Sequence, residues 1–571
     1  MARGRGGLIL VGSEAALGGT GRLAIYTATK GCMLNFGESL WKELKPRGVD
    51  VLNLLIGATA WLGGGLWVPG SSLAAQAGLA DAPGAARVYV HAVVGPSLRA
   101  DLLDAFLDAA PRRVDFLHAH TAVRFALQRG FADWHPQATG FSREGRLLVP
   151  VNFDGRALGE HLALLRPPLA EFNAPGGMMI GLADMAHAAG WTRSLRSFKH
   201  MARLGAAYVL DRLRHPRGLR LTMGNALAAR LLRSALDAGV TLWRRSPMQR
   251  LLIDGSGAVT GIAVERQGRA LHIHARRGVV LASGGFSANP QMRARYLPYP
   301  EHHVSLVPEG NTGDGLQQAL GAGAGFDGDN HSNAGWVVVS VLREADGRLR
   351  KFPHLFLDRG KPGCIAVNAR GQRFGNEAST NLVQPMHRSG SVPAHLICDN
   401  AFIHRYGLGL VRPGGFGLRR LSRAGYVISA ATLAALAEGI GAPAAALQAT
   451  VQRFNAMAAA GADEDFGRGS SAADHVMGDA SHRPNPNLGP ITQGPFHAVQ
   501  IFPGDSTTTV GLRVDADARV LDAAGRPIPG LQAIGLDMNS LWRGRAPGNG
   551  ANNRLGLSFG FIAAQALARG R

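Results

Sequence analysis

The chain has little cysteine, little acidic charge and few aromatic side chains. Its 571 residues include three cysteines, Cys32, Cys364 and Cys398. An odd number of widely spaced cysteines implies neither a disulfide framework nor a zinc site, and it suits a reducing cytoplasm. No uninterrupted apolar run reaches the roughly 20 residues of a transmembrane helix. The apolar run from Leu8 to Val11 is broken by Glu14 too early for a secretion signal, so it predicts a strand.

Charged residues make up 18% of the chain and apolar residues 46%, which is typical of a globular protein with two to four domains. The formal net charge is +21, but the arginines are scattered, with no long basic run and no interleaved aromatic platform. This pattern argues against a nucleic-acid partner. A proteome rich in arginine and alanine explains the charge, and an anionic substrate or a membrane surface is the alternative. The sequence leaves the oligomeric state open and indicates no metal.

A glycine-rich turn follows an apolar run in the middle of the chain. Residues 279–282 form an uninterrupted apolar run that predicts a buried strand, and Ser283, Gly284 and Gly285 follow it. Small residues let the backbone turn sharply and approach a flat ligand closely. Residues 257–274 alternate apolar and polar around turn signals, which predicts an antiparallel meander leading into this strand. Taken alone, the turn fits a purely structural bend equally well.

Further blocks follow in a fixed order. They read GGGLWVP at residues 63–69, GGMMI at 176–180, MGNALAARLLRSALDAGV at 223–240, GNTGDG at 310–315, GLDM at 535–538 and APGNGANNRLGLSFGF at 546–561. From Thr59 to the C-terminus, this series resembles the flavoprotein family of fumarate reductase, succinate dehydrogenase and 3-ketosteroid 1-dehydrogenase, with the steroid branch nearer. Several blocks in order are more specific than any single glycine motif.

The resemblance implies an α/β protein with a Rossmann-like FAD-binding domain over residues 59–286 and 494–571, and an inserted α+β substrate-binding cap over 287–493. FAD is the implied cofactor. Asp537 is expected beside the ribityl chain, because a carboxylate near phosphates is unfavourable unless it bonds a hydroxyl. The expected cofactor contacts are Gly63, Gly64, Gly65, Ala282, Ser283, Gly284, Gly285, Asn311, Gly313, Asp314, Gly535, Asp537, Leu555 and Gly556.

The activity implied by the resemblance is hydride transfer between flavin N5 and a C–C bond next to a carbonyl or carboxylate, in a steroid-like ketone or a carboxylic acid. Such a site needs a proton-transfer group and an anion clamp. The tyrosines of the steroid branch align with Trp134, Asn381 and Ala546, so none is kept. Asn381 does not exchange protons at neutral pH. The nearby titratable side chains are those of His135, His387 and Tyr406, which are each more typical of structural residues.

One catalytic feature of the fumarate branch is retained. Arg554, in the block NRLG, matches an arginine that clamps a substrate carboxylate there, and Gly550 lies in the turn just before it. We predict that Arg554 directly precedes a helix over residues 555–568, and the N-terminal dipole of this helix also favours an anion. An ion pair with Glu377 is the structural alternative for this arginine. The catalytic candidates of the flavoprotein part are therefore Arg554, Asn381, His135 and Gly550.

Residues 1–58 carry a second resemblance. Ser13, Tyr26 and Lys30 are spaced S-x12-Y-x3-K within a predicted βαβ unit, whose helix covers residues 24–45. This segment is similar to the active-site half of a short-chain dehydrogenase/reductase, in which the tyrosine exchanges the proton and the lysine lowers its pKa. The nucleotide-binding half of that family is missing, so the three residues are expected to be vestigial. A nicotinamide-dependent carbonyl reductase and an inactive fusion remnant remain the alternative functions.

This βαβ unit occupies the place where the flavoprotein family has its own first βαβ unit. There a G-x-G-x-x-G turn cradles the pyrophosphate and an acidic residue ends the second strand. Here the turn reads GSEAALGGTG, with Glu14 and Leu17 where the backbone should approach the cofactor, and the second strand ends without a carboxylate. We therefore expect FAD to be bound more weakly than in a relative with the complete motif.

Overall fold

The computed structural model describes residues 6–11, 49–53, 58–61, 63–169, 171, 173–191, 194–243, 246–355 and 358–569; the side chains before Ala60 and those of Asn553 and Arg554 lie outside the description. The chain divides into two compact units. Unit 1 comprises Met1–Tyr296, Val307–Ala334 and Thr507–Arg571, and unit 2 comprises Leu297–Leu306 and Gly335–Ser506.

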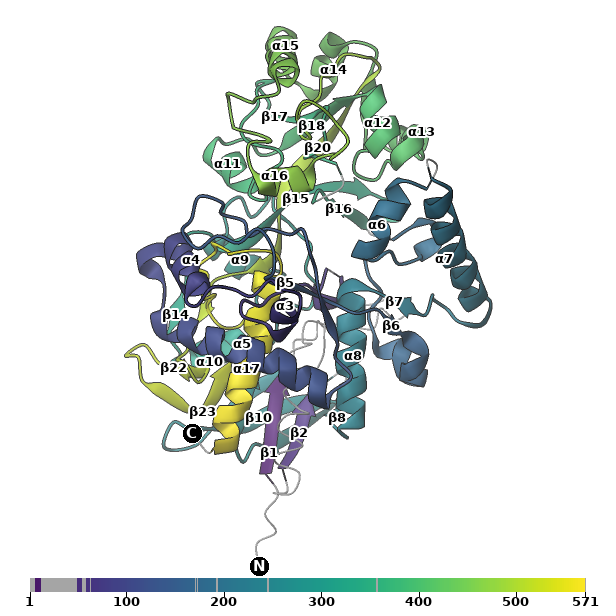
Figure 1. Ribbon diagram of the computed structural model, residues 1–571. Helices are drawn as coiled ribbons and strands as arrows, with labels where there is room; N and C mark the ends of the chain where they lie inside the picture. The colour runs from purple at the N-terminus through teal and green to yellow at the C-terminus, as the bar shows by residue number, and fades with distance from the viewer. Residues whose placement is uncertain are drawn as a thin grey trace, which may run out of the picture. The chain divides into compact units, whose positions relative to one another are not determined.

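Unit 1 is built on a six-stranded sheet in the order β22-β23-β12-β1-β2-β8 (Figure 1). Every neighbouring pair is parallel except β22–β23. All four residues of β12 are buried, as expected for an apolar strand covered on both faces. The strand predicted at residues 279–282 is therefore confirmed. The strands are β22 (Arg519–Leu521), β23 (Pro527–Ala533), β12 (Gly278–Leu281), β1 (Gly6–Val11), β2 (Val49–Asn53) and β8 (Thr241–Leu242).

The first two strands of the chain lie inside this sheet. β1 pairs in parallel with both β12 and β2, so the two strands predicted around the N-terminal unit are present. The predicted helix at residues 24–45 lies outside the described residues. Because the strands alone do not distinguish one nucleotide-binding family from another, the resemblance to short-chain dehydrogenases stays a prediction.

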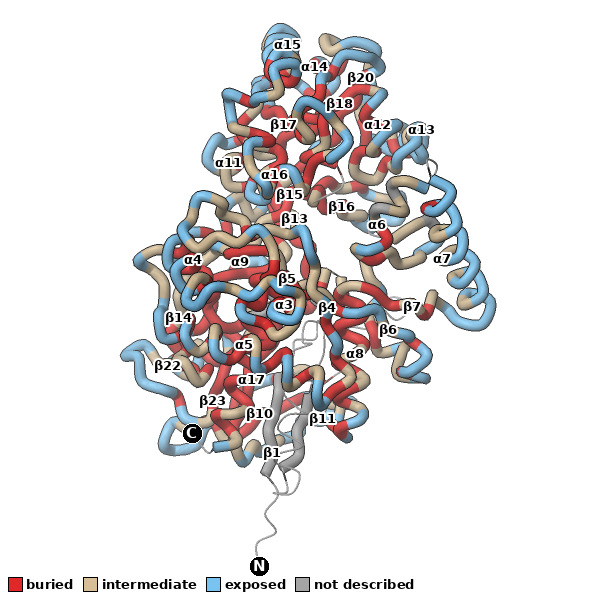
Figure 2. Tube along the Cα trace, viewed as in Figure 1, coloured by how far each residue is buried: buried red, intermediate tan, exposed pale blue. Residues whose placement is uncertain are grey.

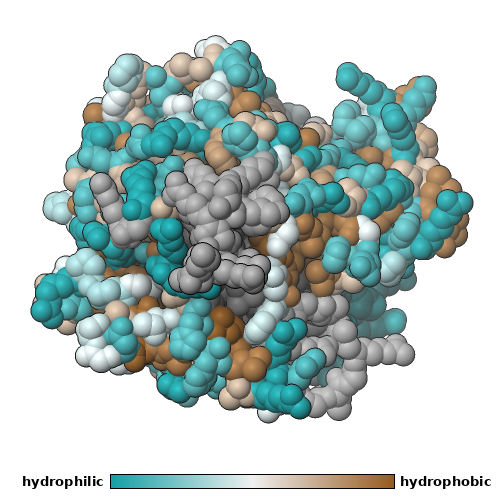
Figure 3. Space-filling view, turned by 90° about the horizontal axis from the view of Figure 1, so that it is seen from below, coloured by the Kyte–Doolittle hydropathy of each residue, from teal (hydrophilic) through white to brown (hydrophobic). Residues whose placement is uncertain are grey.

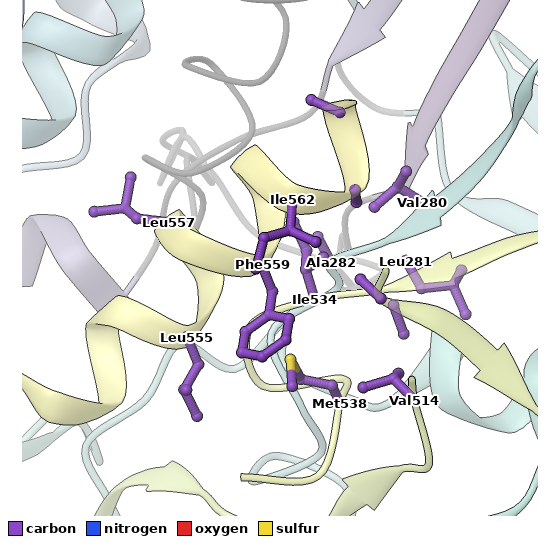
Figure 4. Close-up of a cluster of buried hydrophobic side chains, with 14 of the residues drawn as sticks. Val280, Leu281, Ala282, Val514, Ile534, Met538, Leu555, Leu557, Phe559 and Ile562 are labelled. Carbon is purple, nitrogen blue, oxygen red and sulfur yellow. The ribbon is translucent and has the colours of Figure 1, made fainter. Parts of the chain in front are cut away.

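Helices and a second sheet complete the core of unit 1. α17 (Ala551–Arg569) contacts α5 (Ala100–His120), and α8 (Met223–Asp237) contacts α2 (Ala58–Trp61). Figure 4 shows Phe559 of α17 reaching toward Met538, and Figure 2 shows the buried residues concentrated along these elements. The meander predicted over residues 257–274 is confirmed by the antiparallel pair β10 (Val259–Arg266) and β11 (Arg269–His274), and β9 (Met248–Ile253) extends this sheet beyond the predicted range.

Unit 2 has its own sheet, with the strand order β16-β15-β20-β18-β17, and its described buried apolar residues form three clusters. Cys364 on β17 lies directly opposite Cys398 on β18, and both are free and buried. The two cysteines are therefore neighbours in the sheet although they lie far apart in the sequence. The elements include β15 (Ala334–Arg343), β16 (Leu349–Pro353), β17 (Cys364–Val367), α11 (Val383–Arg388), β18 (Ala394–Asp399), α12 (Asn400–Tyr406), α14 (Leu433–Ile440), α15 (Ala444–Ala460) and β20 (Phe496–Thr508).

The units divide the chain differently from the predicted cap at residues 287–493. Residues 307–334 belong to unit 1 because β14 (Phe326–Asp327) pairs with β21 (Gly511–Leu512) and the loop before α10 (Asp314–Gly321) bonds to the glycine turn. Residues 494–506 belong to unit 2 because β20 lies in the middle of its sheet.

Within the described part of the chain, no helix is both long and apolar enough to span a bilayer. The same residues contain no cluster of three or more His, Cys, Asp or Glu side chains that could hold a metal ion.

Candidate active site

The glycine turn after β12 is fixed by a buried carboxylate. Asp537, with none of its surface exposed, accepts hydrogen bonds from the backbone N–H groups of Ser283 and Gly285 (3.0 Å for Gly285) and from Ser283 Oγ (2.8 Å). Gly284 and Gly285 have φ values of 92° and 75°, which side chains disfavour. The carboxylate therefore joins the turn after β23 to the turn after β12. Contact between Asp537 and a ribityl chain stays a prediction.

The loop before α10 closes over this turn. Asn311 donates from Nδ2 to the carbonyl of Gly284 at 2.7 Å. A Cβ atom on Gly313 would lie 2.8 Å from Phe286 Cβ, so the loop tolerates no side chain there. Among the described residues, the buried Oδ1 of Asn311 and Oγ1 of Thr508 have no hydrogen-bond partner. Two polar atoms therefore remain beside the turn for a ligand.

A second glycine loop packs on the start of α8. Gly64 has a φ of 64°, and a Cβ atom there would lie 2.7 Å from the Cα of Gly224. Met223 also has a positive φ, of 54°, which is rare outside glycine. The buried Oγ1 of Thr222 has no partner among the described residues. The N-terminus of a helix offers unpaired N–H groups, so this junction suits an anion such as a phosphate.

The turn at residues 546–550 is anchored to the loop at residues 133–135. Tyr89 donates its hydroxyl proton to the carbonyl of Pro547 (2.7 Å), and the backbone N–H of Trp134 donates to the same oxygen (3.1 Å). His135 donates from Nε2 to the carbonyl of Ala546 (3.1 Å). Burial lowers the pKa of His135, so the ring is neutral at pH 7. A Cβ atom on Gly550 would lie 2.1 Å from the carbonyl oxygen of Gly65.

These features fit a large flat cofactor. Three glycine segments at residues 63–65, 283–285 and 548–550 allow close backbone approach, and buried polar atoms of Asn311 and Thr508 are left over. A model of the family described as the FAD binding domain matches residues 51–552. The chain belongs to this flavoprotein family.

Relatives of known function agree. The chain is 36% identical over 523 residues to a 4-oxocyclohex-2-ene-1-carboxylate 5-dehydrogenase from Sinomonas cyclohexanicum, covering 90% of this chain and 88% of the relative. It is 34% identical to a 3-oxosteroid 1-dehydrogenase from Mycobacterium tuberculosis, covering 90% and 92%. The crystal structure of 3-ketosteroid delta1-dehydrogenase from Sterolibacterium denitrificans superposes with a TM-score of 0.87 at 32% identity and covers 99% of both chains. This member of the family is a FAD-dependent oxidoreductase that acts on CH–CH groups.

Asn381, His387 and Tyr406, which were named from the sequence as residues near the proton-transfer step, all lie in unit 2. Asn381 is exposed in unit 2, where its backbone N–H bonds Ser379 Oγ at 3.2 Å. Tyr406 donates to Asp479 (2.7 Å), which indicates a structural role. His387 packs against Tyr299 and the edge of Trp336, with ring centroids 5.2 and 4.9 Å away. Burial, followed by the nearby His303, lowers the pKa of His387 to about 4. A role in proton transfer for any of these residues stays a prediction.

The surroundings of Arg554 differ from the prediction in one respect. Helix α17 begins at Ala551 rather than after Arg554, which places this residue in the first turn. Its side chain lies outside the described residues. Glu377, the alternative partner, is buried in unit 2 and already pairs with Arg373 (2.8 Å) and Arg468 (3.0 Å). Leu555 is buried, and a Cβ atom on Gly535 would come within 3.6 Å of the Cα of Gly556.

Some predicted site residues are not described by the structure, and some residues that support the site were not predicted. Ser13, Tyr26 and Lys30 lie outside the described residues. In contrast, no sequence pattern indicated the network that holds the loop at residues 133–135. Trp67 donates to Asp133 at 2.6 Å, and Arg146 pairs with Asp133 (2.6 Å) and Asp81 (2.8 Å). Such pairs link residues far apart in the chain, so no local pattern predicts them.

Proposed function

We propose that the protein dehydrogenates a small cyclic ketone that carries a carboxylate. The anchored turn at residues 546–550 carries this proposal. It lies against the glycine loop at 63–65, and the helix that contains Arg554 begins directly after it. A ketone oxygen and a carboxylate are the two groups that this arrangement of backbone N–H donors and a guanidinium would recognise.

Two lines of support favour an acid over a neutral steroid. A guanidinium grips a carboxylate through two parallel hydrogen bonds, which a single keto oxygen uses only in part. The relative from Sinomonas cyclohexanicum is named for an oxocyclohexene carboxylate. The relatives named for 3-oxosteroids are nearly as similar, so our preference for an acid rests on the expected role of Arg554.

The roles of the residues follow from their contacts. Bound FAD supplies the acceptor for the hydride. His135 and Tyr89 hold the carbonyl groups of Ala546 and Pro547, and thereby position the turn that contains Gly548 and Gly550. We assign the backbone N–H groups of that turn to the ketone oxygen, where they would favour loss of the neighbouring proton.

The test measures reduction of the bound flavin in the absence of oxygen, and the loss of flavin absorbance reports the rate. The parent protein is mixed with 4-oxocyclohexanecarboxylate, with its methyl ester, and with a 3-oxosteroid. We expect the acid to react fastest. Arg554→Lys should lower kcat/KM for the acid by at least about tenfold, because the two parallel hydrogen bonds to the carboxylate are lost. The same substitution should change kcat/KM for the ester little. Equal rates for acid and ester, or an unchanged Arg554→Lys variant, would overturn the carboxylate assignment. Tyr26→Phe serves as a control that is expected to change nothing.

A further inference from the structure

Helix α7 (Leu195–Arg214) is attached to unit 1 by one face only. It contacts α6 (Leu182–Ala189), and its inward residues include the buried Ser197 and the half-buried Leu204, Tyr208 and Asp211. Asp211 accepts a hydrogen bond from Arg156 at 2.7 Å. The helix therefore has a polar and mixed inner face, and its other face is turned to solvent.

The solvent face of α7 is apolar. Leu195, Phe198, Ala202, Ala206, Val209 and Leu213 follow one another at intervals of three or four residues, so they form one stripe along the helix. Leu195, Phe198, Val209 and Leu213 are 69%, 50%, 57% and 75% exposed. Figure 2 draws α7 mostly in the colours of exposed and intermediate residues. In Figure 3, brown atoms reach the surface on the right, the side on which Figure 1 draws α7.

This apolar surface is concentrated at α7. Thirteen large apolar side chains of the described residues are strongly exposed, and six of them, from Trp191 to Leu213, lie on or next to this helix. An ordinary surface helix turns its apolar stripe inward, because exposing it forfeits roughly 25 cal/mol for each Å². A concentrated patch of this kind marks an interaction surface.

Basic side chains border the stripe. Arg196, Lys199 and Arg203 form a row beside it at the same helical spacing, and Arg212 and Arg214 follow near the end. The one acidic residue of the helix, Asp211, points inward to Arg156. The charged residues that border the apolar stripe are therefore all basic, which is complementary to an anionic surface.

We propose that α7 is an interfacial helix that lays its apolar stripe into the surface of an anionic lipid bilayer. Its 20 residues make a rod of roughly 30 Å, and an amphipathic helix with a basic rim lies in the plane of the headgroups. A symmetric contact between two copies of α7 fits less well, because it would bring the two rows of Arg196, Lys199 and Arg203 together. The proposal is independent of the substrate.

The experiment is co-sedimentation of the full, FAD-loaded protein with vesicles. We expect binding to vesicles that contain phosphatidylglycerol and phosphatidylcholine, weaker binding to pure phosphatidylcholine, and release as salt rises. The double variant Phe198→Gln/Leu213→Gln should lose at least about tenfold in partition coefficient through lost apolar burial. Phe416→Gln removes a side chain that is 70% exposed in unit 2 and should bind as the parent does.

A second pair of variants tests the charge. Lys199→Glu/Arg203→Glu should weaken binding to the anionic vesicles and leave flavin reduction intact. The proposal is overturned if the parent ignores both kinds of vesicle, or if the apolar-face variant binds them as well as the parent. It is also overturned if that variant halves the mass measured by light scattering while vesicle binding persists, because the stripe would then be a contact between subunits.

Discussion

Glu377 illustrates how a charged residue is kept ionised inside unit 2. It has no exposed surface, and it contacts Arg373 at 2.8 Å, Arg468 at 3.0 Å and the backbone N–H of Ala366 at 3.1 Å. Burial by itself raises the pKa of a carboxyl group, but the two guanidinium groups outweigh burial and lower the pKa of Glu377 below its ordinary value. The carboxylate therefore stabilises the fold only while it is charged.

This arrangement predicts how the stability of unit 2 depends on pH. Because the folded pKa is lowered, the contribution of Glu377 is complete above the unfolded pKa of roughly 4.3 and is lost as pH falls through the folded pKa. Glu377→Gln removes the carboxylate that the buried Arg373 and Arg468 share, although Arg373 keeps Asp463 at 2.8 Å, and it should cost about 3 kcal/mol at pH 7. Hydrogen exchange of the β17 and β18 amides measures both effects. Unchanged protection in the variant at pH 7 would show that the arginines do not depend on this residue.

A second prediction concerns the two cysteines of unit 2. Cys364 and Cys398 are completely buried, and burial raises the pKa of both thiols well above the ordinary value. Only the thiolate attacks a disulfide reagent, so both should be inert in the native protein. Titration with an aromatic disulfide reagent should report at most Cys32 before denaturation and all three thiols after it. Native labelling of more than one thiol, or any native labelling of Cys32→Ser, would contradict this.

At the scale of elements, the glycine loop before β3 (Leu66–Trp67) offers a matched comparison. Gly64 and Gly70 have φ values of 64° and 68°, so alanine strains the backbone similarly at both. A Cβ atom at Gly64 meets the backbone of Gly224 at 2.7 Å, whereas nothing lies within 4 Å at Gly70. Gly64→Ala should therefore lose at least about tenfold in FAD affinity by pushing the loop from α8, and Gly70→Ala should not. Fluorescence titration of the apoprotein with FAD compares the two, and equal affinities would separate this loop from the cofactor.

The elements that sequence predicted correctly are those specified locally. β12 was predicted from an unbroken apolar run, and the antiparallel pair of β10 and β11 from alternation between turns. Each pattern extends over fewer than 25 residues, and each burial preference acts on the residues that carry it. The glycine blocks added the family, because their order is specific even where each alone is not.

The features that sequence missed depend on partners far away in the chain. Arg468 reaches Glu377 from 91 residues further along the chain, and Asp537 reaches a turn more than 250 residues earlier. Charge in the sequence does not say which pairs are buried. The helix α7 is missed for another reason, since its apolar periodicity predicts a helix but equally predicts that the stripe faces a core. Only the fold shows that this stripe faces solvent.

At the scale of the whole molecule, the central sheet of unit 1 accompanies the predicted loss of a cofactor motif. β1 and β2 fill the positions next to β12, so the central sheet of unit 1 is continuous. The sequence that follows β1 reads G-S-E-A-A-L, and we predict that Glu14 and Leu17 occupy two of the three positions where the G-x-G-x-x-G motif has glycine. A complete motif donates two or three charge-assisted hydrogen bonds to the pyrophosphate, at about 1.5–3 kcal/mol each. Their loss corresponds to at least about a hundredfold in affinity.

Restoring the motif should therefore tighten FAD binding. Glu14→Gly/Leu17→Gly converts the turn to G-S-G-A-A-G, and we expect the Kd for FAD to fall by at least about tenfold because the backbone can then approach the phosphates. Glu14→Gln is the matched control, since it removes the negative charge but keeps the bulk. Retention of FAD through dialysis, followed by titration of the apoprotein, measures the change.

If Glu14→Gln tightens binding as much as the double variant does, repulsion of the phosphates by Glu14 is the obstacle. If neither variant binds FAD more tightly than the parent, the pyrophosphate is held by other residues, and the helix start at α8 with its unpartnered Thr222 Oγ1 is the next position to alter.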